Sequence, residues 1–292
     1  MTIIEKLDYI TPDGQVLPLH NPPSRVVTEI TGWGEPSKQV DTRRGAYQHG
    51  ETIIATWLEP REVSCTLRLQ TRDRDAYWSM RQRLNNALRH SRTEPLYPRP
   101  GVLRRTLSNG QVRCLDVVLM EGLAYTNPGA NTWDEWGIFE QLKFMAHNPV
   151  IYDPQQYLIT PLTGFNSTPT QTRTVVYTGT WAEYPIMTVT GPTDGFAIRN
   201  LTTGHELYYI RTVKAGEVIT IDLRYGEKSL TSNLDGPVTG YLDMGFSDMG
   251  VWSLQPDPVA PQGINQIEVQ TYFTQTTATK FEMSYYLRYE SI

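Results

Sequence analysis

The side chains that most often carry chemistry are widely spaced in this chain. The five histidines are His20, His49, His90, His147 and His205. No two of them have the short spacing of paired metal ligands. We therefore expect surface or loop histidines rather than a metal site, and no motif indicates a cofactor.

Two groups of carboxylates are candidates for acid–base chemistry. They are the neighbours Asp134 and Glu135 and the nearby residues Asp243 and Asp248. Such groups could cleave a glycosidic bond only if the fold brought them together across a cleft. The chain has no Gly-x-Ser-x-Gly elbow, Walker loop or dinucleotide-binding loop. We expect a protein that is not an enzyme, and glycan cleavage stays as a minor hypothesis.

The two cysteines, Cys65 and Cys114, both lie in strand-like runs. The first six residues do not resemble a signal peptide, so we expect a chain made in the cytosol, where disulfides are rare. Two reduced core thiols are the simplest interpretation, and a disulfide is the alternative. A metal site would need further ligands close by in the sequence, and none is present.

Arginine is concentrated in one part of the chain. Residues 1–150 hold 18 Lys and Arg against 17 Asp and Glu, while residues 151–292 hold 8 against 14. Twelve arginines and no lysine lie between Arg61 and Arg113. Acidic residues are interleaved with them, which favours ion pairs between subunits over a solvated face or nucleic-acid binding. The candidate interface residues are Arg72, Arg74, Arg81, Arg83 and Arg89.

The 292 residues suffice for about two domains, and no window has the length and apolarity of a membrane span.

The run 63–69 alternates apolar and polar residues, as a half-buried strand does. A helix is predicted from Asp73 to His90, capped by Asp73 or Thr71, with a core-facing stripe of Tyr77, Met80, Leu84 and Leu88. Asn109-Gly110 between two apolar runs predicts a hairpin. Residues 40–50 are polar and basic, and they predict a loop or arm.

The composition changes after Asp153-Pro154. Short Thr-rich strands and recurring Gly or Pro turns then predict a β-sandwich without a helix. Its aromatic residues are expected in the core or at a protein interface, or on a surface that binds sugar faces. Trp181 and Trp252 are the candidate docking or glycan-contact residues.

The order of several motifs resembles one family. The segment from Tyr184 to Asp222 resembles the C-terminal β-sandwich of distal tail proteins from long-tailed bacteriophages. The first half resembles the ring-forming domain of the same family. The motifs that carry this second likeness are the run 62–69, the Arg-rich helix, Gly101-Val102-Leu103, Asn109 to Arg113, Glu121-Gly122-Leu123 and Asn148 to Asp153. The last strand, Phe281 to Tyr289, resembles the family's final strand.

The resemblance implies a mainly β protein with a ring-forming domain at residues 1–154 and a docking domain at residues 155–292. The first would be a β-sandwich or barrel-like domain with one α-helix, and the second a galectin-like β-sandwich.

The resemblance further implies a virion protein at the distal end of the tail, assembled in the host cytoplasm as a homo-oligomer, a hexameric ring. Its expected partners are the tail tube protein, the tail tip or hub protein in the baseplate, and receptor-binding or side-fibre proteins. It implies no specific nucleic-acid site and no membrane insertion. The alternative is a carbohydrate-binding module that recognises a host-surface glycan.

Overall fold

The computed structural model describes residues 6–71, 73–93, 99–123 and 136–292. The chain forms two compact units, Met1–Pro154 with Glu290–Ile292 and Gln155–Tyr289. The sequence places the last three residues in the second domain, whereas in the structure they pack with the first unit. The backbone N–H of Ile292 donates to the carbonyl of Trp33 at 3.4 Å, and Lys38 Nζ lies 3.5 Å from the Glu290 carboxylate.

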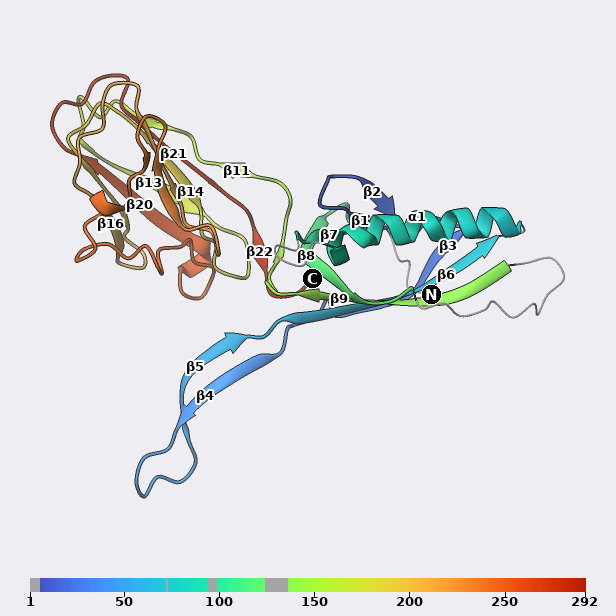
Figure 1. Ribbon diagram of the computed structural model, residues 1–292. Helices are drawn as coiled ribbons and strands as arrows, with labels where there is room; N and C mark the ends of the chain where they lie inside the picture. The colour runs from blue at the N-terminus through green and yellow to red at the C-terminus, as the bar shows by residue number, and fades with distance from the viewer. Residues whose placement is uncertain (1–5, 72, 94–98, 124–135) are drawn as a thin grey trace. The chain divides into compact units, whose positions relative to one another are not determined.

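The first unit is an antiparallel sheet with one helix lying along it (Figure 1). Tyr9 stacks on Phe144 with ring centroids 5.9 Å apart, although two strands separate theirs in the sheet. The sheet is therefore curled on itself, as expected for a β-sandwich or barrel-like domain. In the order in which they neighbour one another, the strands are β2 (Val16–Pro18), β1 (Lys6–Ile10), β7 (Gly101–Thr106), β8 (Val112–Glu121), β9 (Trp136–Ala146), β6 (Arg61–Thr71) and β3 (Arg25–Thr31), with β10 (Ile151–Tyr152) beside β8.

Local sequence patterns determine one of these strands and one strand pair. In β6 the side chains of Val63, Cys65, Leu67 and Leu69 are buried, so the predicted half-buried strand is confirmed. The predicted hairpin is confirmed as β7 and β8, which pair from Gly101 with Val117 to Thr106 with Val112. Gly110 has a φ of 81° at the turn, a conformation that glycine adopts without strain.

Helix α1 (Arg74–Thr93) begins where Asp73 caps it. The two carboxylate oxygens of Asp73 accept the backbone N–H groups of Asp75 and Ala76 at 3.2 and 3.1 Å. The predicted stripe is partly wrong, because Arg81 is buried on the sheet side and Met80 is only half-buried. At 3.6 residues per turn, position 81 lies closer than position 80 to the line through the buried residues 77, 84 and 88.

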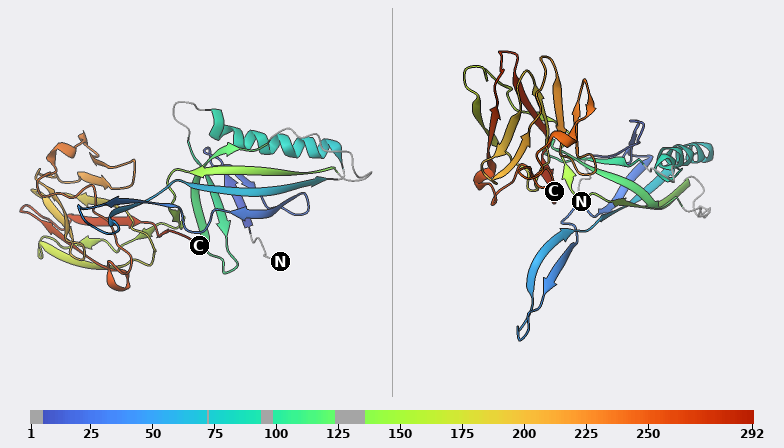
Figure 2. Two further views of the ribbon diagram at one scale, coloured as in Figure 1. Left: turned by 90° about the horizontal axis from the view of Figure 1, so that it is seen from below. Right: turned by 60° about the vertical axis from the view of Figure 1, so that its left-hand side comes forward.

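A two-stranded hairpin, β4 (Lys38–Arg43) and β5 (Thr52–Leu58), extends away from this sheet (Figures 1 and 2). We call it the arm. Every residue of β4 is exposed, and so are most residues of β5. The arm is rooted by Arg61, which is 3% exposed and donates to the carbonyls of Gly32, Gly34 and Pro149. The predicted loop or arm is therefore a paired hairpin with a fixed base.

The second unit is a sandwich of two antiparallel sheets around one apolar core. Its strands alternate buried and partly exposed side chains, as in β14 and β17, which is the two-residue period of a strand with one buried face. One sheet runs β11 (Tyr157–Leu158), β21 (Lys280–Tyr285), β14 (Ile186–Thr190), β17 (Val218–Asp222), β18 (Ser229–Ser232) and β19 (Gly236–Pro237), with β12 (Leu162–Thr163) beside β21. The other runs β13 (Thr170–Val176), β20 (Ile264–Thr271), β15 (Phe196–Asn200) and β16 (His205–Tyr209).

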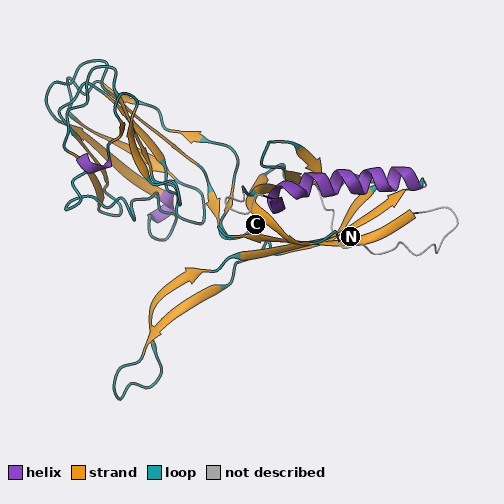
Figure 3. Ribbon diagram, in the orientation of Figure 1, coloured by secondary structure: helices purple, strands orange, loops and turns teal. Residues whose placement is uncertain are grey.

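The remaining elements of the second unit are the short strand β22 (Arg288–Tyr289) and two 3₁₀ turns, η1 (Thr239–Tyr241) and η2 (Pro261–Gly263). Figure 3 shows that strands and loops dominate both units. The expected mainly β fold is confirmed. Within the residues that the structure describes, no helix has the length and apolarity needed to cross a membrane.

Candidate assembly interface

The predicted arginine interface is split by the structure. Arg74 and Arg83 lie exposed on α1, whereas the guanidinium of Arg81 points into the first unit. Arg72 and the side chain of Arg89 lie outside the described residues. The five arginines therefore do not form one surface band.

Arg81 is an internal ion-pair residue. Its Nη2 lies 3.0 Å from the Glu140 carboxylate and donates to the Leu123 carbonyl at 3.2 Å. Burial raises the pKa of Glu140, and the charge of Arg81 opposes that shift. The prediction that Arg81 lies at a subunit interface is wrong, because helical periodicity turns this side chain toward the sheet, where Glu140 balances its charge.

A groove runs between α1 and the β1–β2 hairpin. It consists of two pockets of 440 and 380 Å³ that share the lining residues Val16, Leu17 and Arg83. Met80 and Arg25 also line the larger pocket. Arg25 is half-buried, and burial followed by the positive charge of Arg83 lowers its pKa. Within the described ranges, neither guanidinium has a hydrogen bond or an acidic partner.

The arm carries large apolar side chains into solvent. Ile53, Ile54 and Trp57 are 65%, 58% and 61% exposed. A soluble chain rarely leaves so much apolar surface together unless a partner covers it. We did not single out these residues from the sequence. The run Thr52-Ile53-Ile54-Ala55-Thr56-Trp57 is rich in β-branched and aromatic residues, and that richness could have predicted the second strand of the arm.

The two predicted contact tryptophans of the second unit lie in different environments. Trp252 has no exposed surface and belongs to the apolar core, so it cannot be a docking or glycan-contact residue in the folded unit. Trp181 is half-buried, and its backbone carbonyl accepts a hydrogen bond from Tyr177 Oη at 2.7 Å. Sequence alone could not separate them, because both follow turns in strand-rich segments.

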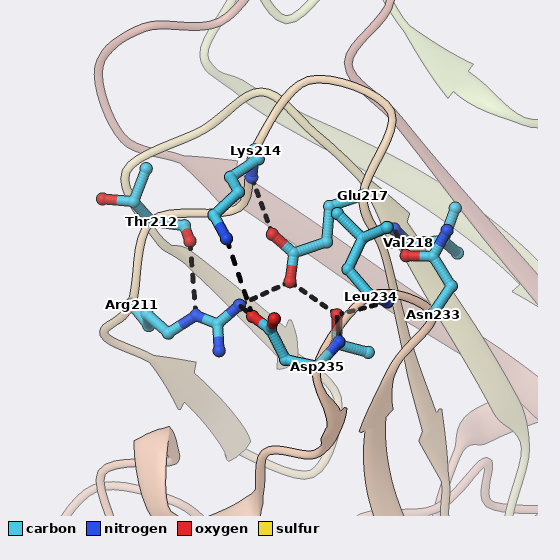
Figure 4. Close-up of polar contacts among 9 residues, drawn as sticks. Arg211, Thr212, Lys214, Glu217, Val218, Asn233, Leu234 and Asp235 are labelled. Carbon is cyan, nitrogen blue, oxygen red and sulfur yellow. Dashed lines mark hydrogen bonds and ion pairs between the residues drawn. The ribbon is translucent and has the colours of Figure 1, made fainter.

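A polar cluster of the second unit surrounds Glu217 (Figure 4). This carboxylate is fully buried, and it accepts hydrogen bonds from Arg211 Nη2 at 2.5 Å, Ser232 Oγ at 2.6 Å and the backbone N–H of Lys214 at 2.8 Å. Arg211 also lies 2.6 Å from Asp235. The two carboxylates are thus tied to one guanidinium, an arrangement that fixes two loops to each other.

The carboxylates that we considered for glycan cleavage do not form a described pair across a cleft. Asp243 accepts the backbone N–H of Gly245 at 3.0 Å and stabilises a turn, while Asp248 accepts that of Glu206 at 3.2 Å and ties its loop to β16. Asp134 and Glu135 lie outside the described residues.

Cys65 and Cys114 are free and buried, and burial raises the pKa of each thiol to about 12.

Solved structures resemble this chain over nearly its whole length. The crystal structure of the SPP1 Dit protein (gp 19.1), described as a paradigm of the hub adsorption apparatus in phages that infect Gram-positive bacteria, matches with a TM-score of 0.66. The match covers 97% of this chain and 98% of that chain at 16% identity. This chain has the fold of a phage distal tail protein. The activated, calcium-bound phage P2 baseplate has a chain with a TM-score of 0.50, 9% identity and coverage of 96% and 97%.

No model of a known protein family matches the sequence, and no curated protein sequence matches it either. The distal tail fold is therefore detectable through structure although sequence identity is low. It spans both units, so the likeness does not rest on one common sandwich domain.

Proposed function

We propose that this chain is a structural protein of the distal end of a phage tail. It forms a ring of identical copies, six by resemblance, that joins the tail tube to the tail tip or baseplate. The observation that carries the proposal is the likeness to the hub protein, which covers 97% of one chain and 98% of the other. Such coverage requires both units to be present in the same order.

The exposed surface of the first unit supports the ring. The arm and the groove are two different surfaces of one chain, and both lack a cover within the described residues. A ring of identical copies needs two different surfaces that meet head to tail. We assign ring formation to the first unit and the docking of receptor-binding or fibre proteins to the second.

The proposed role is not enzymatic. In the second unit, Glu217 and Asp235 are neutralised by Arg211, while Asp243 holds a turn and Asp248 ties a loop to β16. Acid–base catalysis needs groups that are accessible to a substrate and poised to exchange protons.

Light scattering of the full-length protein at several concentrations tests the ring. We expect a species of six times the 33.3 kDa chain mass, and no open polymers of the chain. A chain that stays monomeric up to high concentration, or that grows into open polymers, contradicts a closed ring.

A carbohydrate-binding role is the second candidate, and the exposed ring of Tyr225 now favours it in place of Trp252. Tyr225 is 66% exposed and packs edge to face on Tyr184, with centroids 4.7 Å apart. Apolar sugar faces stack on such rings. Binding of the protein to host cell-wall glycans that is lost in Tyr225→Ala would support this role, and no binding at high glycan concentration would exclude it.

A further inference from the structure

Strand β13, at one edge of the second unit, has a free side. It pairs with β20 over its 7 residues without a register shift. The N–H of Tyr177 donates to the Gly263 carbonyl at 2.8 Å, and that of Thr271 donates to the Pro169 carbonyl at 2.9 Å. Because backbone groups alternate in direction along a strand, the odd-numbered positions of β13 face β20 and the even-numbered positions face away from it. The positions that face away are Thr170, Thr172, Thr174 and Val176.

The outward backbone groups of these four residues have no partner in the part of the chain that the structure describes. Their side chains are exposed as well. Thr and Val favour an extended strand, and β13 contains none of the proline, lysine or bulge with which proteins usually blunt a sheet edge. The strand is therefore a preformed template on which one more strand can pair.

The other edges of the sandwich are closed. Along β16, the N–H of Asp243 donates to the Tyr208 carbonyl at 2.8 Å, and the N–H of Ile210 donates to the Tyr241 carbonyl at 3.0 Å. The N–H of Tyr208 donates to Ser247 Oγ at 2.9 Å. In the other sheet, the edge strands β11, β12 and β19 have 2 residues each, and β19 ends in a proline, which has no N–H. Within the described residues of the sandwich, the open edge is thus that of β13.

Arg173 adds a charge requirement to this edge. Its side chain lies on the core-facing side of β13, between those of Gln171 and Val175, and it is half-buried. Its Nε is buried without a hydrogen-bond partner, and no carboxylate among the described residues pairs with the guanidinium. A buried donor without an acceptor is unfavourable, and a carboxylate on an added strand would supply both an acceptor and the opposite charge. In an antiparallel ladder the residue opposite Arg173 occupies a non-hydrogen-bonded position, where facing side chains lie closest.

From these observations we propose that β13 is the docking site of the second unit. It takes up an extended segment of a partner protein, which pairs antiparallel with β13 and places a carboxylate opposite Arg173. A second copy of this chain is disfavoured, because full antiparallel overlap of two β13 strands sets Arg173 against Arg173 of the second copy. The inference rests on the proposed docking role of the second unit, and it names the surface and the chemistry of the partner.

Binding of two synthetic heptapeptides to the full-length protein tests the site. Both peptides alternate Thr and Val, and the central residue is Glu in one and Lys in the other. We expect the Glu peptide to bind about tenfold or more tightly in fluorescence polarisation, because a close charge pair selects between them. It should also slow hydrogen exchange at residues 170–176 and not along β16. Equal affinities, no binding of either peptide, or protection of another edge overturns the inference.

Two substitutions at one position separate backbone pairing from side-chain effects. Thr174→Pro removes an outward N–H and spares the bonds to β20, so binding of the Glu peptide should be lost. The matched control Thr174→Val keeps the N–H and should bind as the native chain does. Urea unfolding checks that both variants keep the fold. Undiminished binding by a folded Thr174→Pro variant overturns pairing at this edge.

A charge exchange tests the role of Arg173 separately. Arg173→Glu should reverse the preference, so that the Lys peptide binds more tightly than the Glu peptide. An unchanged preference overturns the pairing of Arg173 with a carboxylate of the partner.

The outcomes distinguish this inference from the proposed ring. A hexamer that binds neither peptide overturns the edge site and leaves the ring intact. Monomers that bind the Glu peptide at β13 support the edge site and contradict the ring. A fall in the mass of the assembly in Thr174→Pro but not in Thr174→Val would mean that β13 pairs with a second copy, which overturns the proposed partner.

Discussion

The arm of the first unit and the sandwich of the second are both antiparallel and rich in Thr, Ile and Val, but only the sandwich buries its apolar residues. Trp252 is fully buried in the sandwich, while Trp57 on the arm is 61% exposed. The difference follows from the number of layers. Two stacked sheets enclose a core between them, whereas two strands alone have no second layer to cover either face. Strand-forming sequence therefore does not by itself indicate a buried strand.

The largest effect should come from exchanging these two tryptophans for alanine. Trp252→Ala leaves a cavity in the sandwich core and should lower the free energy of unfolding of that unit by about 3–5 kcal/mol. Trp57→Ala removes exposed surface and should change it by less than about 0.5 kcal/mol. Urea unfolding measures both. Equal losses in the two variants would show that the arm is packed within its own chain.

A second comparison concerns two buried ion pairs, one in each unit. Arg81 lies 3.0 Å from Glu140 in the first, and Arg288 lies 2.6 Å from Glu183 in the second. Arg81→Met should destabilise the first unit by about 3 kcal/mol, because Glu140 is left buried without its partner. Adding Glu140→Leu should restore most of the loss. A neutral Arg81→Met would mean that Arg81 is exposed, as an interface residue would be.

The Glu183 pair should make the stability of the second unit depend on pH. Burial raises the pKa of Glu183, and Arg288 opposes the shift. A carboxyl with a higher pKa when folded contributes stability below its unfolded pKa of about 4.3 and loses it as pH rises through the folded value. Glu183→Gln removes this titration, so the free energy of unfolding of the variant should rise relative to that of the native chain as pH rises from about 4 to 7. The same pH dependence of that free energy in both proteins would contradict the raised pKa.

A small effect is expected at an exposed ring of the sandwich. Lys228 Nζ lies 5.6 Å from the ring centroid of Tyr225 and 4.8 Å from that of Tyr184. Tyr225→Ala should cost at most about 1 kcal/mol, as is typical of exposed cation–π contacts. It should leave the mass of the assembly unchanged, in contrast to Trp57→Ala. A change in oligomer mass would place Tyr225 at the subunit contact instead.

Much of the fold could be predicted from the sequence because the relevant patterns are local. The alternation at 63–69 specifies β6, Asn109-Gly110 specifies the β7–β8 hairpin, and Asp73 marks the start of α1. Each pattern spans only a few residues, so it needs no knowledge of distant contacts. The change in composition after residue 154 is a local pattern in the same sense.

The candidate interface was less predictable. We chose arginines by their density in the sequence, and Arg81 proved to be internal because Glu140, from a strand 59 positions further along, balances its charge. The groove that holds Arg25 and Arg83 joins segments that lie far apart in the chain. No spacing rule could have brought those two residues together.

The sequence by itself determined the strands, the turns, the helix and its cap, because hydrogen bonding and side-chain periodicity act over short distances along the chain. Only the tertiary structure decided which apolar and charged residues remain uncovered. Exposure depends on whether a second layer packs on a strand, and that layer comes from distant residues. For this reason Trp252 became core, and Ile53 and Trp57 remained on the surface.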